Sequence, residues 1–129
     1  MSSSPKTPFQ QVAEFQQQVL HVPSLAYPHF LLPEAEAHNL NCLAEEMTEL
    51  IEAAYERDMA SMADALADLI YFAYGMAYKM GLPFDSIWNL VHSANMSKVK
   101  GMTKRGVETD AAKPEGWSDP KIAIKELLK

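Results

Sequence analysis

Five carboxylates are spaced so that they would meet on two neighbouring helices. Three lie within one helical turn and two lie one turn apart further along the chain: Glu45, Glu46 and Glu49, then Asp64 and Asp68. Residues three or four apart share one face of an α-helix, so each group presents its acids in one direction. Oxygen ligands without cysteine or histidine select hard cations. The pattern therefore predicts a site for Mg²⁺, with Mn²⁺ as a substitute.

Two amphipathic helices must position these acids. Apolar residues recur at spacings of three and four over 40–54, which predicts a helix over 33–57. A second apolar segment predicts a helix over roughly 60–80, ended by Gly81 as a left-handed cap. Because the connection between them is short, the two helices should form an antiparallel hairpin.

The predicted hairpin places acids from both helices at the same height. Glu49 lies nine residues before Asp58, in the predicted turn, and Asp68 lies ten residues after it. At about 1.5 Å per residue, both carboxylates stand roughly 14 Å from the turn, on helices that would pack about 8–10 Å apart. Like charges held this close are costly unless some stay protonated or a cation neutralises them.

A plainer interpretation of such acids is a solvated helix face, and it is our interpretation of Glu52 and Glu56. For the central group, the apolar flanks indicate the border of a core: Met47, Leu50, Leu66, Leu69 and Ile70. A di-iron carboxylate bundle is a further metal-binding alternative, but it needs Glu-x-x-His pairs. No Glu in this chain has a His three residues later, so we exclude it.

The rest of the chain also favours helices, and no segment shows strand alternation. A capping residue followed by a proline predicts helix starts at Thr7-Pro8 and at Asp119-Pro120. Pro83, which follows the turn at Gly81, predicts another helix start. Residues 100–118 mix Gly, Lys, Arg and Pro and predict a loop. The predicted fold class is all-α, with a disordered leader over 1–6 and a single domain over 7–129.

A second set of polar residues follows on the predicted fourth helix and beyond it. The Asn95 amide suits a phosphate or a metal shell, or equally a buried structural role, and Lys98 suits phosphate charge. His92 fits helix packing better than a ligand role. Three bases either close over an anion or are ordinary solvated loop residues: Lys104, Arg105 and Lys113. Trp117 fits an anchor for the tail better than a surface that stacks on a base.

Charge separates along the chain. Residues 34–68 hold ten acids and one base, whereas residues 98–129 hold eight bases and five acids, so the first part suits cations and the tail suits anions. A net charge of −6 over 129 residues argues against polymeric nucleic acid and anionic membranes as partners. Cys42 has no disulfide partner, and the N-terminus lacks a signal-peptide pattern. We therefore expect a cytoplasmic protein.

Four segments in this order resemble the MazG-like, all-α nucleoside triphosphate pyrophosphohydrolases: EEMTE from Glu45, ALADLIYFAYG with Asp68, VHSANMSK, and KPEGW from Lys113. They are similar to a subgroup with dimeric dUTPase-like and phosphoribosyl-ATP pyrophosphohydrolase-like members, over about 9–125. The resemblance implies cleavage of a nucleoside triphosphate into its monophosphate and pyrophosphate, with Mg²⁺ bound. It also implies antiparallel hairpins that form a four-helix-bundle core, completed in a homodimer or a dimer of dimers.

The resemblance also implies residue roles by motif position. Glu46, Glu49 and Asp68 would be metal ligands. Glu45 would be a further ligand or the base that activates water, so Glu45 and Glu46 are the expected catalytic carboxylates. The expected substrate-binding residues are Asn95, Lys98, Lys113, Arg105 and Trp117, with Asn95 and Lys98 facing metal or phosphate.

This chain departs from the family pattern at one position. Many members carry Glu three residues before the equivalent of Asp68, where this chain has Ala65. Asp64 is the candidate substitute, although its side chain would be rotated by about 100° around the helix.

Three functions stay open on the sequence. The first is a Mg²⁺-dependent pyrophosphohydrolase that acts on (d)NTPs, the second acts on a phosphoribosyl-nucleotide, and the third is a non-enzymatic helical dimer whose acids dock a basic partner. Base selection is expected near the first helix and the loop after it, at Phe15, Gln18, His21 or Phe30.

Overall fold

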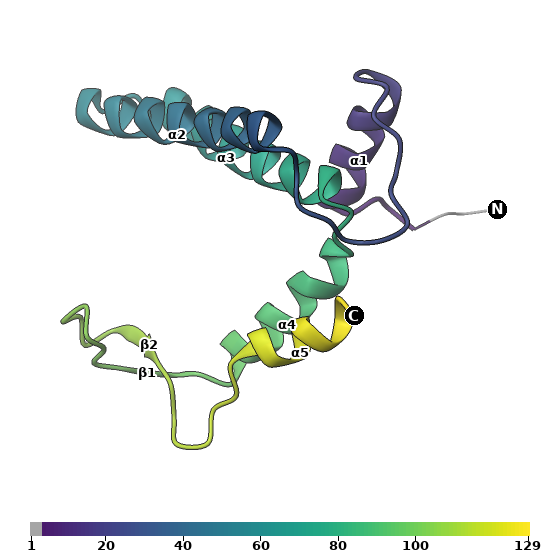
Figure 1. The fold of residues 1–129 in the computed structure, drawn as a ribbon. Helices are drawn as coiled ribbons and strands as arrows, with labels where there is room; N and C mark the ends of the chain where they lie inside the picture. Colours follow the sequence, from purple (N-terminus) through teal and green to yellow (C-terminus); the bar gives the residue numbers. More distant parts are fainter. Residues whose placement is uncertain (1–3) are drawn as a thin grey trace. The chain divides into compact units, whose positions relative to one another are not determined.

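The computed structural model describes residues 4–129, which divide into two compact units after Phe84. The first unit holds three helices, and the second holds two helices and a small antiparallel sheet (Figure 1). Of the predicted leader over 1–6, residues 1–3 lie outside the described residues. Residues 4–6 form no helix or strand, and Lys6 forms an ion pair with Glu14.

The first unit is built around the predicted hairpin, in which α2 (Pro33–Glu56) and α3 (Met59–Lys79) lie side by side (Figure 1). Arg57 ends α2 in the left-handed conformation with a φ of 58°. Asp58 then caps α3 by accepting a hydrogen bond of 3.1 Å from the Ser61 amide. The small buried side chains of Ala53 and Ala65 allow close packing of the two helices. Both predicted helices and their short connection are confirmed.

The third helix of this unit, α1 (Pro8–Gln18), begins at the predicted cap. The Thr7 hydroxyl accepts from the Gln10 amide, and the Gln10 side chain accepts from the Thr7 amide, at 3.1 and 2.9 Å. This reciprocal pair satisfies two amides that a helix start leaves without partners. The helix packs on α3 through buried Val12 and Gln16.

The end of α3 also ties down the long loop between α1 and α2. The Tyr78 hydroxyl donates to the Val22 carbonyl at 2.8 Å, and the His29 amide donates to the Met80 carbonyl at 2.9 Å. Gly81 has a φ of 69°, and a Cβ there would collide with the Tyr27 carbonyl oxygen. The predicted left-handed glycine cap is confirmed.

The second unit contains α4 (Phe84–Met96) from its second residue onward, β1 (Val99–Gly101), β2 (Asp110–Ala112) and α5 (Pro120–Leu127). The predicted helix starts near Pro83 and at Asp119 are confirmed, and the Asp119 carboxylate accepts from the Lys121 amide at 2.8 Å. The two strands pair antiparallel with Lys100 opposite Ala111. The predicted loop over 100–118, and with it an entirely helical fold, is therefore wrong at this point. Each strand has only three residues, which is too short for an alternating pattern to show.

Much of the apolar face of the α2–α3 hairpin is exposed in the single chain. The exposed apolar residues on these helices are Leu40, Met47, Ile51, Tyr55, Met59, Leu66, Ile70, Tyr71 and Phe72. Of the apolar residues that flank the acids, Met47, Leu66 and Ile70 are exposed in the single chain, whereas Leu50 and Leu69 are half-buried. The expected core beside the acids is therefore only partly formed within one chain. Within residues 4–129, none of the helices has an apolar stretch that would reach across a bilayer.

Candidate functional site

The carboxylates of the hairpin form an acidic cluster, defined here as Glu45, Glu46, Glu49, Asp64 and Asp68. Glu46 and Asp68 are half-buried, on α2 and α3 respectively. The other three are exposed. The cluster thus has one partly desolvated acid on each helix and exposed acids around them, which agrees with the sequence-based placement of the two groups on one hairpin.

Glu46 is the most perturbed acid of this cluster. Burial, above all, raises the pKa of its carboxyl to about 7. Glu49 contributes through a hydrogen bond and through its charge, and the charges of Asp68 and Asp64 act in the same direction. The Oε2 atom of Glu46 is buried and has no hydrogen-bond partner in the described part of the chain. A buried carboxylate oxygen among like charges requires either a proton or a cation.

The cluster does not enclose a finished metal site. Among residues 4–129, no group of three or more His, Cys, Asp or Glu side chains is arranged to hold a metal ion. Glu49, Asp64 and Asp68 lie near enough to Glu46 to raise its pKa, whereas Glu45 is not among the groups that do so. The metal and its ligand set therefore stay predictions.

A small cavity of about 140 Å³ lies beside the acidic cluster in the same unit. Its walls come from α1, α2 and α3 and from Leu20 just after α1: Phe15, Gln16, Leu20, His38, Asn39, Cys42, Tyr71, Phe72, Gly75 and Lys79. Cys42 lies one turn before Glu46 on α2, and Phe72 lies one turn after Asp68 on α3. Because residues four apart share a helix face, the cavity and the cluster are neighbours along the hairpin.

Two buried amides give this cavity hydrogen-bonding capacity. Gln16 is 5% exposed, and its Oε1 atom has no partner in the described part of the chain. Asn39 is 6% exposed, and it donates to the Ala35 carbonyl at 2.7 Å while its Oδ1 accepts from Lys79 Nζ at 3.3 Å. Aromatic walls and a few fixed polar groups are typical of sites for planar organic ligands. Of the four predicted base-selecting residues, Phe15 lines the cavity, whereas Gln18, His21 and Phe30 are exposed.

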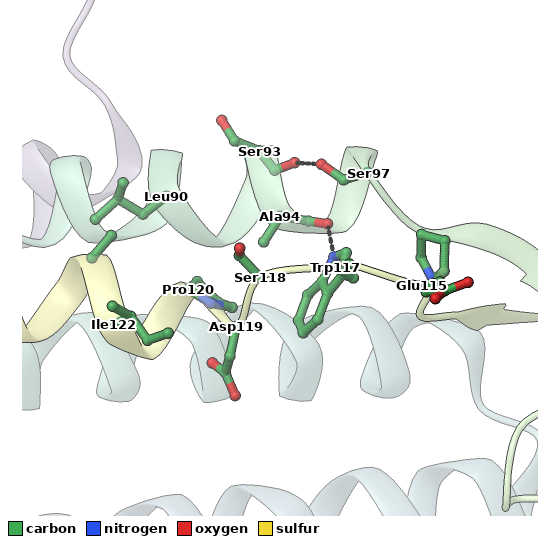
Figure 2. Close-up of a pocket in the computed structure, with 13 residues that line it drawn as sticks. Leu90, Ser93, Ala94, Ser97, Glu115, Trp117, Ser118, Asp119, Pro120 and Ile122 are labelled. Carbon is green, nitrogen blue, oxygen red and sulfur yellow. Dashed lines mark hydrogen bonds between the residues drawn. The ribbon is translucent and has the colours of Figure 1, made fainter.

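The second unit carries the predicted substrate-binding residues. Asn95 and His92 are both exposed on α4, so the alternative of a buried structural amide at Asn95 is wrong. Lys98 and Lys113 place their ammonium nitrogens 5.2 and 5.0 Å from the centroid of the Trp117 ring. Trp117 donates from Nε1 to the Ala94 carbonyl at 2.8 Å, which confirms its role as an anchor of the tail (Figure 2).

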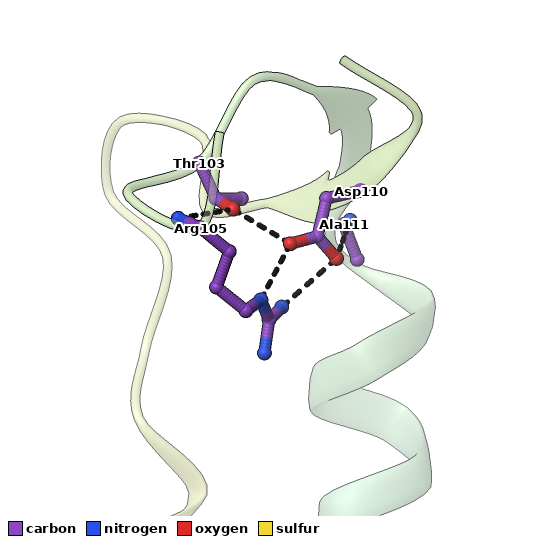
Figure 3. A network of polar contacts seen from close by, with 4 residues as sticks. All are labelled: Thr103, Arg105, Asp110 and Ala111. Carbon is purple, nitrogen blue, oxygen red and sulfur yellow. Dashed lines mark hydrogen bonds and ion pairs between the residues drawn. The ribbon is translucent and has the colours of Figure 1, made fainter. Parts of the chain in front are cut away.

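Arg105 is held by its own unit. Its Nε and Nη2 atoms donate to both oxygens of Asp110 at 2.7 and 2.8 Å (Figure 3). The Thr103 hydroxyl donates to the same carboxylate at 2.6 Å. Arg105 therefore stabilises the hairpin of β1 and β2, and only its remaining N–H groups are available to a ligand.

A comparison with protein families tests the resemblance seen in the sequence. A family model described as phosphoribosyl-ATP pyrophosphohydrolase matches residues 10–95. The chain belongs to this family. This description agrees with the family resemblance seen in the sequence. The matched range contains the acidic cluster, the cavity and Asn95, whereas the lysines, Arg105 and Trp117 of the second unit follow it.

This family member is also similar to an uncharacterized protein of Acanthamoeba polyphaga mimivirus. The two are 29% identical over 87 residues, which is 65% of this chain. The chain spans about a third of the length of that viral protein, since 35% of it is covered.

The cavity is the part of the candidate site that the sequence analysis missed. Its signal lies in Gly75, because glycine in a helix interior is unfavourable by about 1 kcal/mol relative to alanine and calls for a packing reason. That reason is Gln16: a Cβ on Gly75 would lie 3.1 Å from Gln16 Nε2. The polar Gln16 also lies one turn after buried Val12, on the face of α1 that packs on α3.

Proposed function

We propose that this chain is a Mg²⁺-dependent nucleotide pyrophosphohydrolase that cleaves a (d)NTP into the (d)NMP and pyrophosphate. The observation that carries the proposal is Glu46, a half-buried carboxyl with an orphaned oxygen whose nearest electrostatic neighbours are acids. A chain does not keep such an arrangement for stability, because desolvating like charges is unfavourable. Perturbed carboxyls of this kind are typical of functional sites.

The donor set of the acidic cluster fits a divalent cation. Glu46, Glu49 and Asp68 are the proposed ligands, with Glu45 and Asp64 as further ligands, and carboxylate oxygens are what Mg²⁺ prefers. The exposed side chains of Glu49 and Asp64 are able to rotate towards Glu46. When bound, the ion would neutralise phosphate charge and lower the pKa of the attacking water.

The chain's own residues supply the remaining chemistry. Glu45 is the proposed acceptor of the proton that the attacking water loses, because it is an exposed carboxylate adjacent to Glu46. Lys98, Lys113 and the exposed Asn95 are the proposed contacts to phosphate oxygens, since ammonium and amide N–H groups donate to them. We assign Arg105 a smaller share, because Asp110 already binds it.

The cavity is the proposed site for the nucleobase. It is enclosed by α1, α2 and α3, and its amides, Gln16 and Asn39, present hydrogen-bonding groups to the edge of a planar ring. Phe15 and Phe72 supply aromatic surface. Its position one turn from Glu46 and Asp68 suits a substrate that has a planar polar ring at one end and phosphates at the other.

The exposed apolar face of the α2–α3 hairpin supports a homodimer or a dimer of dimers. Contiguous apolar surface on a soluble chain marks an interaction site, and a second hairpin packed on this one would complete a four-helix bundle. Light scattering of the purified protein should give two or four times the chain mass of 14.4 kDa. A monomeric mass at micromolar concentration would contradict the assembly.

A phosphoribosyl-nucleotide is the second candidate substrate, and the description of the matching family favours it. Such a substrate carries a sugar phosphate on its base. A cavity of about 140 Å³ suits a bare planar ring better than a ring that carries this group. The cavity therefore supports the (d)NTP.

The deciding experiment is a panel of ribo- and deoxynucleoside triphosphates together with phosphoribosyl-ATP, with release of pyrophosphate as the readout. We expect release from at least one triphosphate with Mg²⁺ and none with a chelator. Release from phosphoribosyl-ATP alone would replace the (d)NTP assignment. No release from any member of the panel would contradict the enzymatic proposal.

A further inference from the structure

The second unit contains a basic pocket of about 660 Å³, which shares no residue with the acidic cluster. Eight residues line it: Lys98, Met102, Thr103, Lys104, Arg105, Ala111, Ala112 and Lys113. Half of them are bases, and all come from the hairpin of β1 and β2 and its flanks. Concentrated positive charge in a concave surface attracts anions.

The positive charge of this pocket rests on its lysines. Arg105 is neutralised by Asp110. Within residues 4–129, no carboxylate forms an ion pair with Lys98, Lys104 or Lys113. Three ammonium groups without a carboxylate partner repel one another. Another contact is therefore needed to keep them close together.

Trp117 provides that hold for two of the three lysines. Its indole lies 5.2 Å from Lys98 Nζ and 5.0 Å from Lys113 Nζ, within the range in which an aromatic face attracts a cation. The ring is itself fixed, because Nε1 donates to the Ala94 carbonyl of α4 and the residue is half-buried. A fixed ring that attracts both ammonium groups limits where they can lie.

The indole is not part of the surface that an anion in the basic pocket would touch. Trp117 lines the adjacent groove, of about 650 Å³, which Figure 2 shows between α4 and the segment that leads into α5. It is absent from the eight residues that line the basic pocket. We therefore expect Trp117 to act on an anion there through Lys98 and Lys113.

We propose that Trp117 is a positioning residue, which holds Lys98 and Lys113 as a pair that binds two neighbouring phosphoryl groups of a condensed phosphate chain. Two point charges near one ring suit a ligand that carries its negative charge on adjacent phosphates. The inference rests on the proposed function for its ligand class. It adds that phosphate binding by this unit needs no metal.

The test measures binding of inorganic triphosphate to the full chain by calorimetry, with a chelator present. Trp117→Phe and Trp117→Leu are a matched pair, because both lose the hydrogen bond to Ala94 while only the first keeps an aromatic ring. We expect Trp117→Leu to weaken binding about tenfold and Trp117→Phe to stay within about threefold of the wild type. Circular dichroism and melting temperature check that both variants fold.

Two lysine variants complete the design. Lys98→Met with Lys113→Met should weaken triphosphate binding at least as much as Trp117→Leu. Lys100→Met removes one charge from β1 outside the pocket and should change binding less than twofold. Adding Trp117→Leu to the double lysine variant should produce no further loss, because the indole acts through those lysines.

Several results would overturn the inference. Equal loss in the Phe and Leu variants would mean that the Ala94 hydrogen bond, and not the ring, matters. Loss of nucleoside monophosphate binding without loss of triphosphate binding would make Trp117 a surface that stacks on a base. Unchanged triphosphate binding in Trp117→Leu, in a preparation whose wild type hydrolyses nucleotides, would remove this inference and leave the proposed function intact. Conversely, triphosphate binding that depends on Trp117 in a chain without hydrolytic activity would sustain the inference alone.

Discussion

Asp110 and Glu46 are both half-buried carboxylates, one in each unit, and their surroundings are opposite. Asp110 accepts hydrogen bonds from the Arg105 guanidinium, the Thr103 hydroxyl and the Ala111 amide, and these hold its pKa well below the usual range (Figure 3). Glu46 is desolvated among acids, which raises its pKa to about 7. Where the chain supplies the positive charge, a carboxylate stabilises the fold. Where it supplies only more carboxylates, the carboxylate is available to a cation from outside.

The largest expected effect is on catalysis in the acidic cluster. Glu49→Gln removes the charge of a proposed metal ligand beside Glu46 and should lower pyrophosphate release by more than a hundredfold. Mutation of a residue that only supports a metal ligand typically lowers metal affinity or activity by about 10–100-fold, and loss of a ligand itself should lower activity further. The helical content should not change, since Glu49 is exposed. Glu52→Gln, an exposed acid on the same helix, is the matched control and should retain activity. Equal loss in both variants would mean that the general charge of α2 matters and not this cluster.

The second effect concerns stability and its dependence on metal. Mg²⁺ should raise the melting temperature of the wild type by several degrees, because a ligand that binds only the folded state stabilises it by mass action. Glu46→Gln should raise the melting temperature of the metal-free protein, because an uncharged amide avoids the cost of a desolvated acid among acids. The same variant should lose most of its response to Mg²⁺. A metal-free variant that is less stable than the wild type would show that Glu46 is structural, as Asp110 is.

A third effect separates the cavity from the phosphate-binding groups. Gly75→Ala should preserve the free energy of unfolding or raise it by up to about 1 kcal/mol, because alanine favours the helix. Its Cβ would lie 3.1 Å from Gln16 Nε2, which is close enough to push the Gln16 side chain aside. The KM for a nucleotide should then rise severalfold, with no change in the affinity for inorganic triphosphate. Ala73→Ser, at an exposed position of α3, is the control. Equal effects on nucleotide and triphosphate would remove the assignment of the cavity to the base.

Regular elements were predictable because their signals are local. Thr7, Asp58 and Asp119 cap the helices that follow them, and apolar periodicity located α2 and α3. The placement of acids on one hairpin followed from helix geometry alone, since spacing along the chain converts directly into height along a helix. The acidic cluster was predictable for this reason.

The cavity and the β-hairpin were not predictable, because each depends on contacts between residues far apart or on very short elements. Gln16 meets Gly75 across 59 positions of sequence, and no local pattern reports that contact. Asp110 and Arg105 are five residues apart in a segment rich in turn-forming residues, where three-residue strands leave no periodicity. The exposure of Met47 and Ile70 was also hidden, because periodicity identifies an apolar face without identifying what covers it.

The smallest expected effect concerns Asp110, whose charge is neutralised by Arg105 of the same chain. Because the folded-state pKa of Asp110 lies below its unfolded value near 4, the folded hairpin binds fewer protons than the unfolded chain in mildly acidic solution. Its stabilisation is therefore present above pH of about 4 and is lost as the pH falls through the depressed folded value. Amide hydrogen exchange of β1 and β2 should stay slow from pH of about 7 down to about 4, after correction for intrinsic rates, and protection should fall below that.

Asp110→Asn is the matched variant, because it removes the charge without changing the shape of the side chain. It should show at pH of about 7 the reduced hairpin protection that the wild type shows only in acid. The loss should be modest, since Arg105 is exposed and exposed ion pairs contribute little. Unchanged protection in this variant would mean that Thr103 and strand pairing hold the hairpin without the ion pair. The difference between Asp110 and Glu46 would then depend on burial alone. The positive charge that Arg105 supplies to Asp110 would no longer explain why one carboxylate is structural and the other is available to a cation.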